Sequence, residues 1–411
     1  MTDGRAVGEK IMIGKRLFGT VYSLVLLILL AAGEIALVCV IAWQEGIPAL
    51  ACAVAGFLLS VIFTPMFHEL GHAFFGKKQG MRLKMTKFFC FKISETEGKL
   101  RFSFSSPFLP EETQMIPRSG GNMRRRALCY TAGGLIGGGV WLIVLLAAAL
   151  ICGIFSRVAA LLFWSGVPYA VYLFLLNAVP AIYAGGKTDA EIFRGILRDC
   201  APEKAMVCAM EIYGQLSEGK SFSEIAEEWY FGFPQLAENE PMYAMMLDLR
   251  YRRYLENGET EKAADCLNRL GALAEPGYLY PEQLADLALE FVYMHILNGD
   301  LKSAEESMKL GELTGKDRKN TAAYCRVNAL RCASEGKNEE ADCWKSAAEE
   351  FLRREPLEGV RKSERILLSR IACPAQEAGT EEVAGETSSV GADGGEERNT
   401  EEKPPAGQTG N

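Results

Sequence analysis

The sequence predicts an α-helical integral membrane protein with about four transmembrane helices and a short β-hairpin insertion, followed by a soluble all-α helical-repeat domain. Two observations support this fold class. The first 190 residues contain four long apolar runs, whereas the rest of the 411-residue chain is polar and acidic. In the polar part a glycine–alanine spacing recurs three times. A chain of this length favours two or three domains.

Composition and cysteine usage limit the classes of partner. The net charge of −8 averages over two unlike halves, and the basic residues lie beside the apolar runs rather than in one basic patch. The sequence thus lacks the clustered basic residues that are typical of a nucleic-acid-binding protein. Twelve cysteines are scattered without a Cys-x-x-Cys pair, and those in the polar half are typical of a reducing compartment. We therefore expect no nucleic-acid partner and no disulfide framework.

The four apolar runs define a membrane domain over residues 17–190, preceded by an N-terminal arm, 1–16. Each run exceeds the ~20 residues that cross the hydrocarbon core of a bilayer. Buried helices of a soluble core are a poor explanation for four runs of this length. The predicted spans are 17–43, 47–75, 127–155 and 158–184.

The charges that flank the runs predict their direction in the cell membrane. The connection 76–126 holds twelve Lys or Arg residues, and the arm 1–16 is also basic. The connection 44–46 holds none, and the turn 156–157 holds only Arg157. By the positive-inside rule, we expect a multi-pass protein with both termini in the cytoplasm.

The long connection between the second and third runs has β character. Its segment FCFKISETEGKLRFSFSS alternates apolar and polar residues around a Thr-Glu-Gly turn, which predicts a hairpin of residues 89–94 and 99–105. Two interpretations fit. The hairpin is an ordinary amphipathic one on the membrane surface, which we favour, or its edge strand receives an extended substrate.

Three ionisable residues end the second run, in the segment FTPMFHELGHAFF. Membrane helices avoid such groups unless they serve a function. His68 and His72 are four residues apart and therefore share one face of a helix. Two imidazoles at that spacing suit one zinc ion, and Glu69, rotated by ~100°, suits a general base beside it. The chain has only three histidines, which argues against a chance match.

A catalytic zinc usually has three protein ligands, so one more ligand is expected. No Asp or Glu occurs between Glu112 and Asp189, and Asp189 follows the fourth run on the side of the histidines. We predict Asp189 as the third ligand, with Glu191 as the alternative. A competing interpretation is that Asp189 only caps the helix that follows. The third histidine, His295, lies in the polar half and is interpreted as an ordinary helix-face residue.

These motifs together resemble the site-2 protease family of intramembrane zinc metalloproteases (peptidase M50-like). The resemblance covers residues 45–195 and is carried by HELGH at the second span, then Asn177-x-x-Pro180, then Asp189. It implies a Zn²⁺ ion held by His68, His72 and Asp189, with Glu69 as the catalytic base. It also implies that Asn177 and Pro180 shape the substrate-binding site, and that the substrate is a membrane protein, typically with a single span.

Two departures from the family pattern are visible. The family often has Asn-x-x-Pro-x4-Asp-Gly, whereas here Asp189 follows Pro180 by nine residues and Ala190 stands in place of the glycine. The third span has AGGLIGGG, where many relatives carry Gly-Pro-x-x-Asn, so Leu135 and Gly138 replace that Pro and Asn. We interpret the glycines of this span as a packing strip, since small residues let membrane helices approach closely.

The polar half, residues 191–373, is predicted to be a cytoplasmic domain of helical hairpins. In three similar segments a glycine precedes an alanine by five residues, at repeat distances of about 37–41 residues. The pairs are Gly258 and Ala263, Gly299 and Ala304, and Gly336 and Ala341. This resembles tetratricopeptide-type repeats, which bind proteins or peptides. A simple helical bundle is the alternative. Residues 374–411 are predicted to be disordered.

The sequence therefore favours an intramembrane zinc endopeptidase that cuts membrane proteins near the cytoplasmic face, with a helical domain that binds a protein partner. A catalytically silent membrane scaffold is the alternative, although a scaffold has no need of Glu69. A transporter with a polar site at membrane depth is disfavoured, because it predicts more spans and pseudo-repeated halves.

Overall fold

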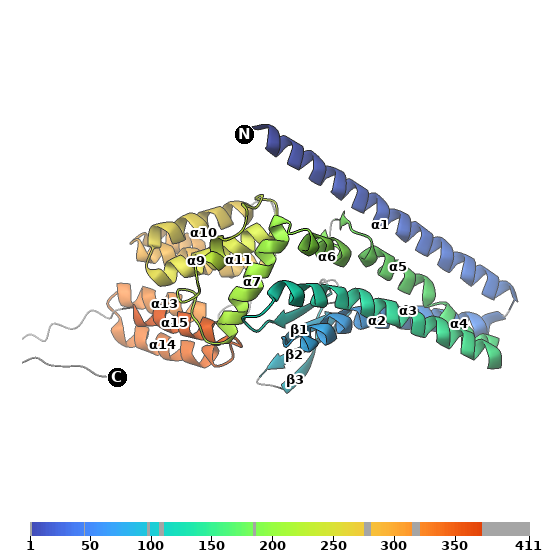
Figure 1. Ribbon diagram of the computed structural model, residues 1–411. Coiled ribbons are helices and arrows are strands. Elements are labelled where there is room, and N and C mark those ends of the chain that lie inside the picture. The colour runs from blue at the N-terminus through green and yellow to red at the C-terminus, as the bar shows by residue number, and fades with distance from the viewer. Residues whose placement is uncertain are drawn as a thin grey trace, which may run out of the picture. The chain divides into compact units, whose positions relative to one another are not determined.

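The computed structural model describes residues 2–44, 46–96, 99–106, 111–183, 186–274, 281–314 and 321–371 (Figure 1). Residues Met1–Cys373 form one compact unit, to which all described residues belong. The predicted disordered tail, 374–411, lies outside the described residues, as does most of the turn predicted at Thr96-Glu97-Gly98.

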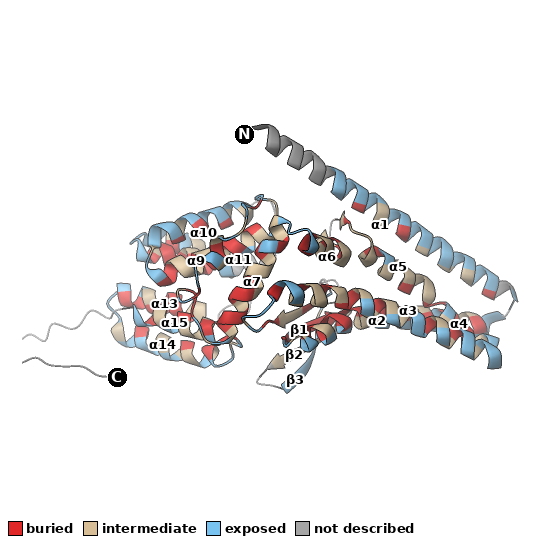
Figure 2. Ribbon diagram, in the orientation of Figure 1, coloured by how far each residue is buried: buried red, intermediate tan, exposed pale blue. Residues whose placement is uncertain are grey.

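Four helical stretches of the described chain are long and apolar enough to cross a membrane. They are Gly14–Ile41 within α1, all of α2, all of α3, and Arg157–Ala178, which comprises α4 and α5. Much of their apolar surface is exposed (Figure 2), as expected of helices that face lipid rather than a protein core. The predicted helical membrane-type architecture is thus supported by length and composition.

The helix bounds differ from the predicted spans in ways that have physical causes. Helix α1 runs from Thr2 to Gln44, so the predicted arm is the first part of the same helix. Helix α2 (Gly46–Lys78) extends three residues beyond the predicted end of its span. Helix α3 (Met123–Phe155) begins four residues early because the Asn122 side chain accepts a hydrogen bond from the Arg125 amide and caps it.

The fourth predicted span, 158–184, is confirmed as an apolar helical stretch only as far as Ala178, and it consists of two helices. The chain forms α4 (Arg157–Trp164) and α5 (Val167–Ala178), separated by Ser165 and Gly166. Helix α5 stops before Pro180, whose ring lacks an amide donor and disfavours a helical conformation at the residue before it. The chain then forms a short ribbon of β5 (Ile182–Tyr183) and β6 (Gly186–Lys187), which leads to α6 (Asp189–Leu197).

The connection between α2 and α3 forms a four-stranded antiparallel sheet in the order β3-β2-β1-β4. The predicted hairpin is confirmed as β2 (Phe91–Thr96) and β3 (Lys99–Phe104). Strands β1 (Arg82–Phe88) and β4 (Glu112–Ile116) were not predicted, and β4 pairs with β1 across a bulge between Leu83 and Met85. The sheet contacts α2 through β1 and β4.

The described part of the chain after α6 consists of helices and their connections. Each predicted glycine has a positive φ at a turn between two helices that pack on each other, and each paired alanine is buried. The turns join α9 to α10, α11 to α12 and α13 to α14. The helices are α7 (Ala201–Ser217), α8 (Glu228–Phe231), α9 (Pro241–Asn257), α10 (Thr260–Ala274), α11 (Pro281–Leu297), α12 (Leu301–Thr314), α13 (Ala322–Ser334), α14 (Asn338–Leu352) and α15 (Glu358–Ser369).

Candidate metal centre

Three side chains from two distant parts of the chain meet at one point. His68 and His72 lie on α2, and Asp189 is the first residue of α6. Oδ2 of Asp189 lies 3.1 Å from Nε2 of His68 and 3.2 Å from Nε2 of His72. One potential ligand atom of each residue lies within 4.8 Å of the other two. Both histidines are buried, so the three groups face one another with little competition from solvent.

Close backbone contact between α2 and α3 creates room for this cluster. A β-carbon at Gly71 would lie 2.2 Å from the carbonyl oxygen of Gly133, so only glycine permits this approach. At Gly134 a β-carbon would lie 2.3 Å from Nε2 of His72 and 2.7 Å from Oδ2 of Asp189. The glycines of α3 therefore serve packing, as predicted, and Gly134 also leaves space beside the donor atoms.

The tautomer of His72 follows from a contact with α3. Its Nδ1 lies 2.8 Å from the carbonyl oxygen of Tyr130. Because a carbonyl only accepts, Nδ1 carries the proton, and Nε2 is the ring nitrogen that faces Asp189. A backbone carbonyl in this position is the usual way in which a protein orients a metal-binding histidine.

Glu69 lies beside the cluster with one oxygen unsatisfied. Its side chain is buried, and Oε2 has no hydrogen-bond partner among the described residues. Its main chain is anchored to the sheet, since the Thr113 hydroxyl donates to the Glu69 carbonyl at 3.1 Å. Thr113 is held in turn by Thr86, and the Tyr130 hydroxyl donates to the Thr113 carbonyl. Strand β4 thus connects α2 and α3 at the level of the cluster.

Asp189 is held in place by its neighbour Thr188. The Thr188 hydroxyl accepts hydrogen bonds from the amides of Ala181 and Glu191 and donates to the carbonyl of Val179. Thr188 is therefore the N-cap of α6, and the interpretation of Asp189 as a mere cap is wrong. Burial alone would raise the pKa of Asp189, but the two imidazoles outweigh burial and lower that pKa below its usual range.

The other predicted site residues make different contacts. Glu191, the alternative ligand, forms ion pairs with Lys15 and Arg194 instead. The Asn177 amide donates to the Leu173 carbonyl of its own helix, at 3.2 Å. Pro180 follows the end of α5. His295 lies near the end of α11 and stacks on Phe291. The substrate-binding role of Asn177 and Pro180 stays a prediction.

Sequence reasoning missed three parts of this arrangement: the space at Gly134, the Tyr130 carbonyl and the Thr113 hydroxyl. Gly134 carried a signal, since it lies in the glycine strip, but only the helix contact reveals which glycine faces the donor atoms. The Tyr130 carbonyl carries no sequence signal, because every residue has one.

The donor set fits a metal ion. Two imidazole nitrogens and one carboxylate oxygen, each able to bind a cation, converge at one point. Asp189 Oδ2 and Glu69 Oε2 are buried without a hydrogen-bond partner of good geometry, which is costly unless a ligand or ion meets them. Two histidines and one carboxylate suit Zn²⁺, although other divalent transition metals accept the same donors.

The comparisons with known proteins leave the family undecided. No protein-family model, no curated protein and no solved structure matches the chain.

Proposed function

We propose that the protein is an intramembrane zinc endopeptidase of the site-2 protease type, which hydrolyses peptide bonds of membrane proteins near the cytoplasmic face. One observation carries the proposal. Two histidines of an apolar, membrane-length helix converge with Asp189 at the start of α6, and a buried carboxylate with a free oxygen lies beside them. A structural cluster has no use for the free oxygen of Glu69.

The proposed membrane placement follows from charge and length. Four apolar stretches cross the cell membrane, and the basic connection 76–126 and both termini face the cytoplasm. His68 and His72 lie in the last three turns of α2, close to the basic end of that helix. Water therefore reaches the centre from the cytoplasmic side.

His68, His72 and Asp189 would hold the metal, which we take to be Zn²⁺. When bound, the ion would supply a water of pKa ~7 and would polarise the peptide carbonyl. Glu69 accepts the proton of the attacking water and returns it to the leaving amine. The Tyr130 carbonyl keeps the Nε2 lone pair of His72 aimed at the centre, and Gly134 leaves room beside it.

The substrate must present an extended backbone, because a helix conceals its own peptide groups in hydrogen bonds. We place it beside Asn177 and Pro180, where α5 ends and the chain becomes extended. The three helix pairs after α8 supply a surface for a protein partner that recruits or regulates the substrate. A catalytically silent scaffold that uses only this surface is the competing function.

The test compares wild type with Glu69→Gln in the native host by quantitative mass spectrometry of membrane proteins. Glutamine keeps the shape of the side chain and cannot act as a base, so a ~10²- to 10⁴-fold loss of turnover is expected. Single-span proteins or membrane stubs should accumulate in the variant alone. His295→Gln, distant in the chain, is the control. An unchanged membrane proteome in a variant that still binds metal would favour the scaffold.

A further inference from the structure

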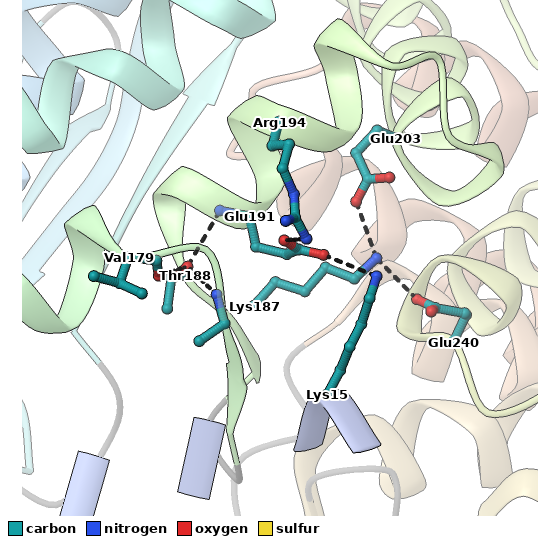
Figure 3. Close-up of polar contacts among 9 residues, drawn as sticks. Lys15, Val179, Lys187, Thr188, Glu191, Arg194, Glu203 and Glu240 are labelled. Carbon is teal, nitrogen blue, oxygen red and sulfur yellow. Dashed lines mark hydrogen bonds and ion pairs between the residues drawn. The ribbon is translucent and has the colours of Figure 1, made fainter. Parts of the chain in front are cut away.

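A largely buried ion-pair cluster lies next to Asp189, the third residue of the candidate metal centre. Nζ of Lys187, at the end of β6, lies 2.9 Å from Oε1 of Glu203 on α7 and 3.2 Å from Oε2 of Glu240 (Figure 3). Glu240 is the N-cap residue of α9. The two carboxylates thus come from the helical part of the chain, and they hold a lysine that stands two residues before Asp189.

The burial of this cluster separates it from an ordinary surface contact. The side chain of Lys187 is 20% exposed, and those of Glu203 and Glu240 are 6% and 12% exposed. Charges withdrawn from water this far are stable only when they are paired. By contrast, Lys15 is 48% exposed in its pair with Glu191.

The approach of Glu203 depends on a glycine of α6. A β-carbon at Gly195 would lie 2.4 Å from Cδ of Glu203, so the carboxylate rests directly on the α6 backbone. Helix α6 begins with Asp189. The helix that carries the third metal-binding residue is therefore packed against the same carboxylate that holds Lys187.

The segment between Lys187 and Asp189 is held by several hydrogen bonds. Thr188 lies between them, and its hydroxyl bonds to Val179, Ala181 and Glu191 at 2.9, 3.1 and 3.2 Å. Its amide also donates to the Ala181 carbonyl at 3.1 Å. Strand β6 and the first turn of α6 are thus joined in one hydrogen-bonded segment, which Lys187 ties to Glu203 and Glu240.

We propose that Lys187 is a positioning residue for Asp189, and that Glu203 and Glu240 are the contacts through which the helical region sets the geometry of the metal centre. The inference rests on the proposed metal centre. It implies that a protein partner which shifts α7 or the start of α9 changes metal retention without contacting the metal ligands.

The test measures Co²⁺ binding to the metal-free, full-length protein in lipid nanodiscs, by visible absorption and by competition with a chelator. Lys187→Met should weaken Co²⁺ retention by ~10- to 100-fold, the usual effect of losing a contact that orients a ligand, and should alter the absorption band. Lys187→Arg should restore retention to within a few fold. Lys362→Met, which removes an exposed lysine paired with Glu224 at 2.6 Å, is the control and should bind as wild type does.

A second variant covers the case in which Lys187→Met does not fold. Gly195→Ala keeps every charge and displaces the Glu203 carboxylate, and it should also weaken retention and alter the band. Wild-type retention and an unchanged band in the folded variants would overturn the positioning role alone. If the wild type itself takes up no Co²⁺, the proposed metal centre fails, and this inference fails with it.

Discussion

Two regions of this molecule bury ionisable side chains, and they do so in opposite ways. In the helical region, Arg326 on α13 is buried and lies 2.7 Å from a carboxylate oxygen of Glu290 and 2.9 Å from one of Glu364. The Tyr251 hydroxyl donates to Glu290 at 2.7 Å, and the guanidinium lies 4.1 Å from the ring centre of Tyr293. This cluster contains its own cation.

The candidate metal centre brings imidazoles and carboxylates together at one point. Imidazole nitrogens of His68 and His72 face a carboxylate oxygen of Asp189, and Glu69 keeps an oxygen free. The comparison teaches that burial of charge is not by itself a sign of function. A cluster that contains its own cation is explained by stability, whereas converging imidazoles and carboxylates are the groups that a bound metal ion would need.

The largest expected effect on stability lies in the helical region. Arg326→Met should lower the free energy of local unfolding by about 3–5 kcal/mol, because it leaves Glu290 and Glu364 buried without their cation. Hydrogen exchange of α11 and α13 in the full-length protein measures this loss. Arg331→Met, an exposed arginine on the same helix, should stay within about 0.5 kcal/mol of wild type. Equal exchange in both variants would show that the cluster is not structural.

The next largest effect tests whether Gly134 leaves space for a metal ion or serves only the packing of α2 on α3. Gly134→Ala should weaken zinc retention at least ~10-fold and cost about 1–3 kcal/mol, since the new methyl group would overlap His72 and Asp189. Gly138→Ala is the matched control, because its nearest neighbour would be Nδ1 of His68 at 3.7 Å, an ordinary contact. Metal analysis after dialysis compares the two. If both retained zinc as wild type does, the donor atoms would not enclose the metal as described.

The smallest expected effect is a dependence of stability on pH, and it is confined to the helical region. Burial alone would raise the pKa of Glu290, but Arg326 and Arg252 outweigh burial and lower it below the usual value of ~4.3. The stability that Glu290 contributes is therefore present above pH ~4.3 and is lost as the pH falls through its lower folded-state pKa. Hydrogen exchange of α11 between pH 6 and 3 should show the loss, and Glu290→Gln should flatten it. A loss that begins above pH 5 would contradict this sign.

Much of the fold was predictable because strong local signals set it. Long apolar runs specify helices regardless of their neighbours, and glycine at a positive φ marks each helix turn, as at Gly258. The break between α4 and α5 was missed because Ser165 and Gly166 are tolerated within helices. Strand β1 was missed because its pairing with β4 joins residues about 30 apart, which no local pattern reveals.

The site was predictable to the extent that its residue types are rare in apolar segments. His68, Glu69 and His72 stand out for that reason, and Asp189 is the first carboxylate after a long interval without one. The choice between Asp189 and Glu191 required the structure, since Thr188 and the Lys15 pair decide which carboxylate faces the histidines. The contribution of Gly134 required the contact between α2 and α3.

The most direct test of the metal centre is the metal content of the purified full-length protein, measured by mass spectrometry of the elements. The account predicts one zinc ion per chain in wild type and in Glu191→Ala, and a loss of that zinc in His72→Ala and Asp189→Ala. Wild type without zinc, or an Asp189→Ala variant that retains it while Glu191→Ala does not, would contradict the account.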